Sequence, residues 1–371
     1  TVLLLLLSIV GIGVGGLTVP YDTLAEYVPN AYRGTTMLSL NYFWTFGSMM
    51  ALSAAYISLN YFHSWRVLVV VTSIPCWVSA FAGWYLVPET PRWLCAHGKF
   101  DQALETLRQG ATQNGHDALQ LFPPGTTLVV EVGEEEEFNF QALCLPQWRW
   151  IVMNLSGAWA GFGLLYYGTI LAITIIFQKN EANSNELDFD YSAIFTSASA
   201  EIFGVLLVIL TVDRWGRVPS QAWSYIVGGL CASSMCFGSS VWGWHDRTLA
   251  VLAFGARLFM MSASCVTWII TPELLTTEVR ATGHGVVNAM ARVTGILSPF
   301  VVQKSRTVAG IVLLITSILS AFCVLQLPET AGRSMGGAGG AASQEESTAE
   351  EPLVDQLVGA AEGEEDVVAI G

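Results

Sequence analysis

The sequence predicts an all-α membrane protein that crosses the bilayer nine times. Of its 371 residues, 53% are hydrophobic and only 12% are charged, about half of the charged share of a soluble domain. Charge is absent from several stretches of about 20 residues, which is the length that a helix needs to cross the hydrocarbon core. Two motifs also recur in the same order in the two halves of the chain. Together these observations indicate a membrane protein built on an internal repeat.

Six of the nine expected spans contain no Asp, Glu, Lys or Arg. They cover residues 1–21, 34–62, 67–88, 150–178, 218–244 and 307–328. Three more reach the required length by including one charge each: 191–212 with Glu201, 248–272 with Arg257, and 285–303 with Arg292. A backbone inside lipid must satisfy its own hydrogen bonds, so we expect all nine spans to be helices.

Charged residues concentrate between and after the spans. We expect four parts: residues 1–94 with three spans, an acidic loop at 95–148, a six-helix half at 149–332, and an acidic tail at 333–371. Residues 100–109 of the loop predict a short surface helix. The tail beyond Arg333 has nine acidic residues and no Lys or Arg, a composition that predicts disorder because it buries too little apolar surface. The net charge of −14 argues against nucleic-acid binding.

The distribution of Lys and Arg predicts the orientation, because cytoplasmic loops carry the excess of these residues. If the loop after the first span is cytoplasmic, that side carries Arg33, Arg92, Lys99, Arg108, Arg149, Arg214, Arg217, Arg280 and Arg333. The other side carries only Arg66, Lys179, Arg247, Lys304 and Arg306. This bias predicts a multi-pass protein whose acidic loop and C-terminus are cytoplasmic.

The internal repeat consists of two pairs of matching motifs. Glu26 lies seven residues before Arg33 after the first span, and Glu273 lies seven residues before Arg280 after the seventh. Two spans later the copies read Pro-Glu-Thr-Pro-Arg at 88–92 and Pro-Glu-Thr-Ala-Gly-Arg at 328–333. The second copy has six spans and the first has three. Two six-helix units in parallel repeat are the plan of one large transporter class, so three helices of the first copy are expected to be missing.

These motifs resemble the major facilitator superfamily, in the branch with synaptic vesicle glycoprotein 2-like, sugar-porter and organic-ion-like transporters. The similar segments are residues 24–34, 88–94, 213–217 and 290–293. The resemblance implies a twelve-helix bundle that is N-terminally truncated, with helices 4 to 6 in residues 1–94 and helices 7 to 12 in 149–332. Ile209 and Val218 depart from the family pattern, which has a glycine and a basic residue at these places.

The resemblance implies a secondary active transporter, a symporter or exchanger that moves a small organic solute by alternating access. The expected partners are a small-molecule substrate, the lipid bilayer and a coupling proton, and the acidic tail offers a surface to cytoplasmic proteins. The sequence shows no nucleophile with a base partner, no metal-ligand spacing and no phosphate loop. No enzyme activity, cofactor or metal is therefore expected.

Three charged residues lie near the middle of their spans and are candidates for substrate binding or coupling. A charge at that depth costs about 2.5–3.5 kcal/mol, so Glu201, Arg257 and Arg292 need compensation. They either face a central cavity, or Glu201 and one arginine form a fixed strut between helices. Two arginines against one glutamate favour an organic anion or a zwitterion.

Aromatic residues of the 150–178 span form a second set of candidates for substrate contact, namely Trp159, Tyr166 and Tyr167. The alternative interpretation is that these rings only pack between helices. A sugar porter would instead use neutral polar groups such as those of Asn154, Gln178 and Asn288. A non-transporting protein, truncated or receptor-like, is the remaining alternative.

Charged residues at the cytoplasmic helix ends are candidates for gating, because an ion pair that forms in one state and breaks in another makes a two-state element. The candidates are Asp22, Glu26, Arg33, Glu89, Arg92, Asp213, Arg214, Gly216, Arg217, Glu273, Arg280, Glu329 and Arg333. Gly216 is included because it permits a tight turn between two spans. The alternative is a set of solvated ion pairs worth about 0–1 kcal/mol each.

Overall fold

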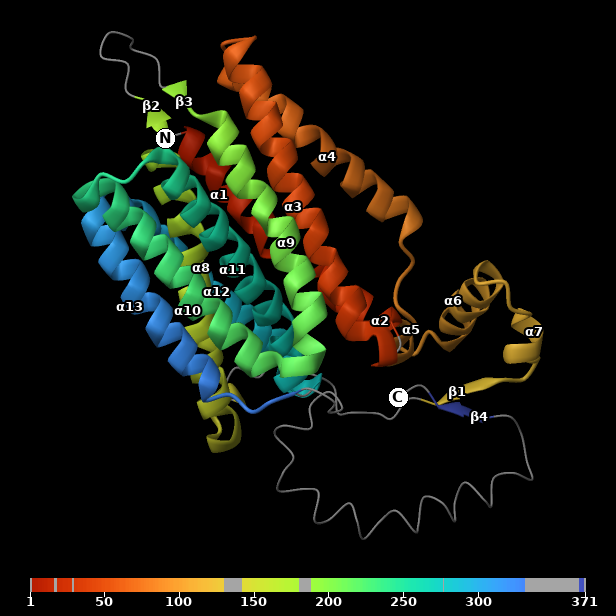
Figure 1. Ribbon diagram of the computed structural model, residues 1–371. Helices are drawn as coiled ribbons and strands as arrows, with labels where there is room; N and C mark the ends of the chain where they lie inside the picture. Colours follow the sequence, from red (N-terminus) through yellow and green to blue (C-terminus); the bar gives the residue numbers. More distant parts are fainter. Residues whose placement is uncertain are drawn as a thin grey trace. The chain divides into compact units, whose positions relative to one another are not determined.

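The computed structural model describes residues 2–16, 19–28, 30–129, 142–179, 188–275, 277–330 and 367–369. The chain divides into two compact units. The first comprises Thr1–Arg33, Val70–Glu137 and Ala341–Gly371, and the second comprises Gly34–Val69 and Phe138–Gly340. Figure 1 labels the helices and strands of both.

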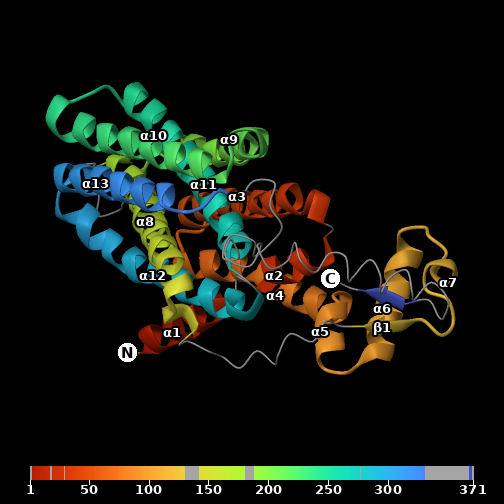
Figure 2. The same ribbon diagram turned by 90° about the horizontal axis from the view of Figure 1, so that it is seen from below.

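Six long helices form the core of the second unit. They are α8 (Pro146–Ile176), α9 (Tyr191–Trp215), α10 (Arg217–Phe237), α11 (Asp246–Leu274), α12 (Thr277–Lys304) and α13 (Arg306–Leu325). In both views they run alongside one another as a bundle (Figures 1 and 2). Helix α8 packs against α11, α12 and α13, while α10 packs against α11 and α13, and α9 packs against α11. Helices α8 and α11 therefore each contact at least three other helices of the bundle.

Short connections join these helices. The 3₁₀ turn η2 (Ala142–Cys144) precedes α8, and the antiparallel strands β2 (Gln178–Lys179) and β3 (Asp188–Phe189) lie between α8 and α9. The π-helical segment η3 (Gly238–Trp242) extends α10. Asp190 caps α9, because its side chain accepts the backbone N–H of Ala193 at 3.1 Å.

Small residues let the helices of the bundle approach closely. A side chain at Gly163 of α8 would collide with the backbone oxygen of Ala291 on α12, and the Thr294 hydroxyl of α12 donates to the Ala160 oxygen of α8 at 2.7 Å. Small residues and hydroxyls that bond to the neighbouring backbone are typical of helix contacts in membranes. At this point the α8 backbone lies in direct contact with α12.

Helix α3 (Asn30–Asn60) belongs to the second unit from Gly34 onward. Its Leu38 is buried in the same hydrophobic cluster as the bundle residues. Its Tyr56 packs edge-to-face against Tyr191 of α9, with ring centroids 5.2 Å apart. Helix α3 therefore packs against the bundle through aromatic and aliphatic side chains.

The first unit contains mostly short elements. They are α1 (Val2–Gly15), α2 (Val19–Tyr27), most of α4 (Trp65–Leu86), α5 (Pro91–Ala96), α6 (Phe100–Gln113), α7 (Ala118–Leu121), β1 (Thr127–Val129) and β4 (Val367–Ala369). Strands β1 and β4 pair in parallel, with Thr127 opposite Val367. The surface helix expected at 100–109 is present as α6, which extends to Gln113 and buries Ala103 and Ala111 on one face.

The all-α membrane fold is confirmed, and each of the nine expected spans contains helix. Seven helices among the described residues are long and apolar enough to cross a membrane: Trp65–Leu86, Trp148–Ile176, Tyr191–Trp215, Arg217–Trp242, Asp246–Leu274, Thr282–Lys304 and Arg306–Leu325. Helix α1 has 14 residues, fewer than the roughly 20 that a span requires. Helix α3 has 31 residues, but polar side chains such as Asn41 and Thr45 make it less apolar. The tail expected to be disordered, residues 333–371, lies outside the described residues except for β4.

Candidate functional site

Two charges predicted inside the membrane form an ion pair within the bundle. The Arg257 guanidinium of α11 lies 2.7 Å from Oε1 of Glu201 on α9, and the two side chains are 6% and 0% exposed. The Tyr166 hydroxyl of α8 donates to the same carboxylate oxygen at 2.8 Å. The structure thus brings together one glutamate, one arginine and one tyrosine from three different helices.

Close packing of α9 against α11 explains why the pair can form. A side chain at Gly204, one turn from Glu201, would collide with the backbone oxygen of Leu258, the neighbour of Arg257. The Ser262 hydroxyl of α11 donates to the Gly204 oxygen at 2.9 Å. Because glycine and serine hold the two backbones together here, the carboxylate reaches the guanidinium across the interface.

Each member of the pair retains one polar atom that is not satisfied. Within the described residues, Oε2 of Glu201 and Nε of Arg257 are buried without a hydrogen-bond partner. An unpaired buried polar atom is costly, and more so when it carries charge. Oε2 of Glu201 can therefore accept a proton or a hydrogen bond, and the Nε–H of Arg257 can donate a hydrogen bond.

Arg292 of α12 is held separately from this pair. Its guanidinium donates to the Tyr167 hydroxyl at 3.2 Å, and it is partly buried. Among the described residues no carboxylate lies within 4 Å of it. Tyr166 and Tyr167 are adjacent on α8, with ring centroids 5.5 Å apart. Tyr166 contacts the Glu201–Arg257 pair, and Tyr167 contacts Arg292.

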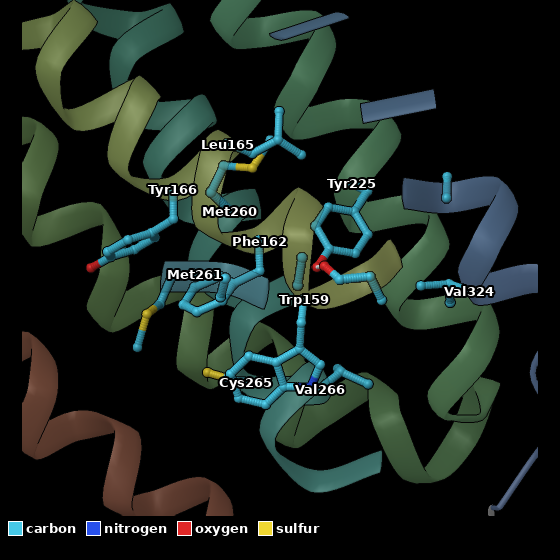
Figure 3. Packing of buried hydrophobic residues seen from close by; sticks show 14 of the residues in the cluster. Trp159, Phe162, Leu165, Tyr166, Tyr225, Met260, Met261, Cys265, Val266 and Val324 are labelled. Carbon is cyan, nitrogen blue, oxygen red and sulfur yellow. Dashed lines mark hydrogen bonds between the residues drawn. The ribbon is translucent and has the colours of Figure 1, made fainter. Parts of the chain in front are cut away.

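Trp159, a candidate for substrate contact, lies inside the protein core. Its side chain is fully buried, and its indole N–H donates to the Thr271 hydroxyl at 2.9 Å. The ring packs edge-to-face against Trp268, with centroids 4.9 Å apart. Figure 3 shows Trp159 with Phe162 and Tyr166 in the buried cluster. In this conformation Trp159 contacts protein side chains on α11.

A second cluster lies where α9 ends and α10 begins. Gly216 connects them with a φ of +93°, a conformation that L-residues other than glycine rarely adopt. The Glu329 carboxylate, which follows α13, accepts the backbone N–H groups of Arg217 at 2.8 Å and Val218 at 3.0 Å. These N–H groups have no partner within their own helix, and a carboxylate at a helix N-terminus interacts favourably with the helix dipole.

Arg217 links this cap to two further acidic residues. Its guanidinium lies 3.0 Å from Asp213 and 3.4 Å from Glu273 at the end of α11. The Thr330 hydroxyl donates to the same Glu273 oxygen at 2.5 Å. The cluster therefore connects α9, α10, α11 and the segment after α13.

Two further gating candidates have exposed side chains in the part of the chain that the structure describes. Arg214 is exposed in the last turn of α9. The Glu89 side chain is exposed, and its backbone oxygen accepts a hydrogen bond from the Tyr27 hydroxyl at 3.1 Å. The side chains of Asp22, Glu26, Arg33, Arg92 and Arg280, and the whole of Arg333, lie outside the part of the chain that the structure describes.

Trp44 of α3 is a further member of the Glu201 network that was not predicted from the sequence. Its indole N–H donates to the Tyr166 hydroxyl at 2.7 Å, so it joins the Glu201 network. A signal was present, because Trp44 lies inside the 34–62 span, whereas tryptophans of membrane proteins concentrate at span ends. An indole N–H at that depth also needs an acceptor.

Comparison with known proteins identifies the family of the chain. The family described as "Sugar (and other) transporter" matches residues 1–338. The chain belongs to this transporter family. Its membership agrees with the resemblance to the major facilitator superfamily and with the expectation that the chain is not an enzyme.

Relatives from animals and plants resemble this transporter-family chain over most of its length. The svop-1 protein of Caenorhabditis elegans, which is named as a transporter, is 30% identical over 90% of this chain and 66% of its own length. The synaptic vesicle 2-related protein of Rattus norvegicus is 28% identical over 90% of this chain and 62% of its own length. Organic cation/carnitine transporter 7 of Arabidopsis thaliana is 28% identical over 90% and 74%, respectively. The chain thus spans about two thirds of the length of these relatives.

A solved structure shows the same fold. The major facilitator superfamily proton:xylose symporter XylE superposes with a TM-score of 0.60 and 19% sequence identity. The superposition covers 87% of this transporter-family chain and 70% of XylE. The helical bundle described above is therefore a major facilitator fold.

Proposed function

We propose that the chain is part of a secondary active transporter that moves a small organic solute by alternating access. The observation that carries this proposal is the buried Glu201–Arg257 pair, which lies between helices long enough to cross a membrane. A buried ion pair adds little net stability compared with apolar residues of similar volume. Charged residues inside membrane helices commonly mark substrate or ion pathways, so a functional role explains the pair better than a role in stability.

A zwitterion is the solute that best fits the pair. Arg257 neutralises Glu201, so the excess positive charge lies at Arg292 and not at the pair itself. A solute with both charges can replace each partner, its cationic group binding Glu201 and its anionic group binding Arg257 or Arg292. Two relatives are named for solutes, as an organic cation/carnitine transporter and as a proton:xylose symporter.

A proton is the proposed coupling ion. Oε2 of Glu201 has no partner among the described residues, so it is a position where a proton can bind. Protonation of Glu201 removes its attraction for Arg257 and frees the guanidinium for the solute. The pair then exists in two arrangements, which proton and solute binding shift.

The cluster around Arg217 is the proposed cytoplasmic gate. It joins α9, α10, α11 and the segment after α13 through Glu329, Glu273 and Asp213. In the proposed cycle these contacts break when the cytoplasmic side opens. The proposal retains the orientation expected from Lys and Arg, with the acidic loop and the C-terminus in the cytoplasm.

Uptake into proteoliposomes that contain the full chain tests the proposal. Four labelled solutes are compared with and without an inward proton gradient: a quaternary-ammonium carboxylate, an organic anion, an organic cation and a neutral sugar. We expect the zwitterion to be taken up fastest, with stimulation by the gradient. Glu201→Gln should remove this uptake, whereas Glu105→Gln, which changes an exposed carboxylate on α6, should leave it unchanged.

A second variant separates loss of function from misfolding. Removing one partner of a buried pair costs about 3–5 kcal/mol, because the other charge is left uncompensated. Glu201→Gln combined with Arg257→Met removes both charges and should restore folding but not uptake of the zwitterion. Normal uptake by this double variant would contradict the proposal.

The solute comparison also decides between the alternatives. Uptake of only the neutral sugar by the wild-type chain would favour a sugar porter. A folded wild-type chain that moves none of the four solutes would favour a non-transporting protein. Fastest uptake of the organic anion would instead make Arg292 the main binding group.

A further inference from the structure

A chain of hydrogen bonds connects helix α3 to the buried ion pair. The Trp44 indole N–H donates to the Tyr166 oxygen at 2.7 Å, and the Tyr166 hydroxyl donates to Oε1 of Glu201 at 2.8 Å. We propose that Trp44 is a positioning residue that directs the hydroxyl proton of Tyr166 onto Glu201, and thereby sets the pH at which Glu201 takes up a proton. This inference rests on the proposed coupling role of Glu201.

The chemistry of the three groups fixes the direction of the chain. An indole N–H can only donate, whereas a phenol can donate and accept. Trp44 therefore occupies an acceptor position of the Tyr166 oxygen and leaves the hydroxyl proton to point at Glu201. A hydrogen bond donated to a carboxylate is strongest when the carboxylate is ionised, so Trp44 favours the ionised form of Glu201.

Without the indole N–H, the phenol is free to reverse its role. Its hydroxyl can rotate away, and its oxygen can accept a proton donated by a neutral Glu201. The neutral acid then gains a hydrogen bond that it lacks while Trp44 is in place. Removing the Trp44 donor should therefore allow Glu201 to take up a proton at a higher pH.

No other described group near Glu201 is a hydrogen-bond donor whose direction Trp44 could set. Helix α11 contributes Arg257, which is permanently charged, and the nearby thiol of Cys265. Helix α8 contributes Tyr166, and α3 contributes Trp44 through Tyr166 together with Tyr42, which lies near Cys265. Tyr166 is thus the donor whose direction can change, and Trp44 is its contact on α3.

Trp44 and Tyr166 differ in exposure, so the hydrogen bond between them can break without opening the protein core. Tyr166 is 3% exposed, whereas Trp44 is 40% exposed. Their ring centroids are 6.3 Å apart at an angle of 60°, so the rings meet edge-on. The indole is therefore placed at the surface of the buried cluster, with its N–H directed inward.

Infrared titration of the purified full chain in lipid nanodiscs tests the inference without relying on transport. The carbonyl band of the protonated Glu201 side chain is assigned by its loss in Glu201→Gln, and its intensity is followed against pH. Tyr166→Phe removes the donor to Glu201, and we expect it to raise the midpoint by about one pH unit, equivalent to about 1.4 kcal/mol. Trp44→Phe keeps an aromatic ring but removes the N–H, and it should shift the midpoint in the same direction by less.

Trp223→Phe is the matched control, because Trp223 is an exposed residue on α10. It should leave the midpoint unchanged. An unchanged midpoint in Trp44→Phe, an equal shift in Trp223→Phe, or the absence of a titrating band that Glu201→Gln removes would each overturn the inference. Normal uptake by Glu201→Gln would overturn the proposed function, while the titration would still decide the role of Trp44.

Discussion

The carboxylate of Glu329 caps helix α10 by accepting the backbone N–H of Arg217 at 2.8 Å. The two residues are 112 positions apart in the chain, so this cap joins the end of the last helix of the bundle to the start of its third. Glu329 belongs to a Pro-Glu-Thr motif that also occurs in the first half of the chain, where the side chain of the matching Glu89 is exposed. The two copies of the motif thus differ in what their glutamates contact.

Glu329→Ala should lower the thermal stability of the protein, because two N–H groups at the start of α10 lose their acceptor. Loss of a side-chain cap typically costs about 0.5–2 kcal/mol. Thermal unfolding in detergent is the measurement, and Glu89→Ala is the control because it changes the matching glutamate of the first copy. Equal effects of the two substitutions would contradict the assigned cap.

Gly216→Ala should destabilise the protein more than Gly243→Ala. Both glycines have positive φ, but Gly216, with φ +93° and ψ 164°, lies in a region that essentially only glycine adopts, whereas Gly243, with φ +59° and ψ 40°, is in the left-handed helical region that other residues can enter at a cost. A side chain at Gly216 would also collide with the Glu329 carboxylate, whereas nothing lies within 4 Å of one at Gly243. Unfolding temperatures of the two variants provide the comparison, and similar losses would argue against the close approach of Glu329.

Thr271→Val should destabilise the bundle, because it leaves the buried indole N–H of Trp159 without its acceptor. An unsatisfied buried donor costs about 1–3 kcal/mol. In a double-mutant cycle with Trp159→Phe, the combined loss should be smaller than the sum of the single losses, because the second change removes the unpaired donor. Strict additivity would show that the 2.9 Å contact contributes nothing.

Cys95 should react slowly with a maleimide at neutral pH. It is buried beside Leu94 and Ala103, and burial raises the pKa of the Cys95 thiol, so the reactive thiolate is scarce. In a chain that keeps only Cys95, labelling should accelerate as the pH rises. A chain that keeps only the exposed Cys144 should label faster at pH 7, and the difference should disappear on unfolding. Equally fast labelling in the folded state would show that Cys95 is accessible.

The helices were predictable because apolar length is a local property of the sequence. The three spans that include one charge are all helical. Glu201 and Arg257 lie at the interface between two of them, α9 and α11. What the sequence could not decide was which arginine pairs with Glu201. That choice depends on the contact between α9 and α11 at Gly204, a contact between segments distant in the chain.

Other parts of the site depend on tertiary contacts that leave weaker local signals. Trp44 joins Glu201 only because α3 and α8 bring an indole and a phenol within 2.7 Å across 122 residues. The end of α1 at Gly15 was also not predicted, because an uncharged run does not reveal where a helix ends. Gly15 and Gly16, adjacent residues at the end of α1, were the available signal.

The glycine contact between α8 and α12 has a consequence for selectivity by molecular length. Gly163 brings the α8 backbone against Ala291, so the main chain beside Arg292 is packed directly on α8. In the proposed function, a solute that binds both centres at once has to reach from Arg292 to the Glu201–Arg257 pair, and a shorter molecule occupies only one of them.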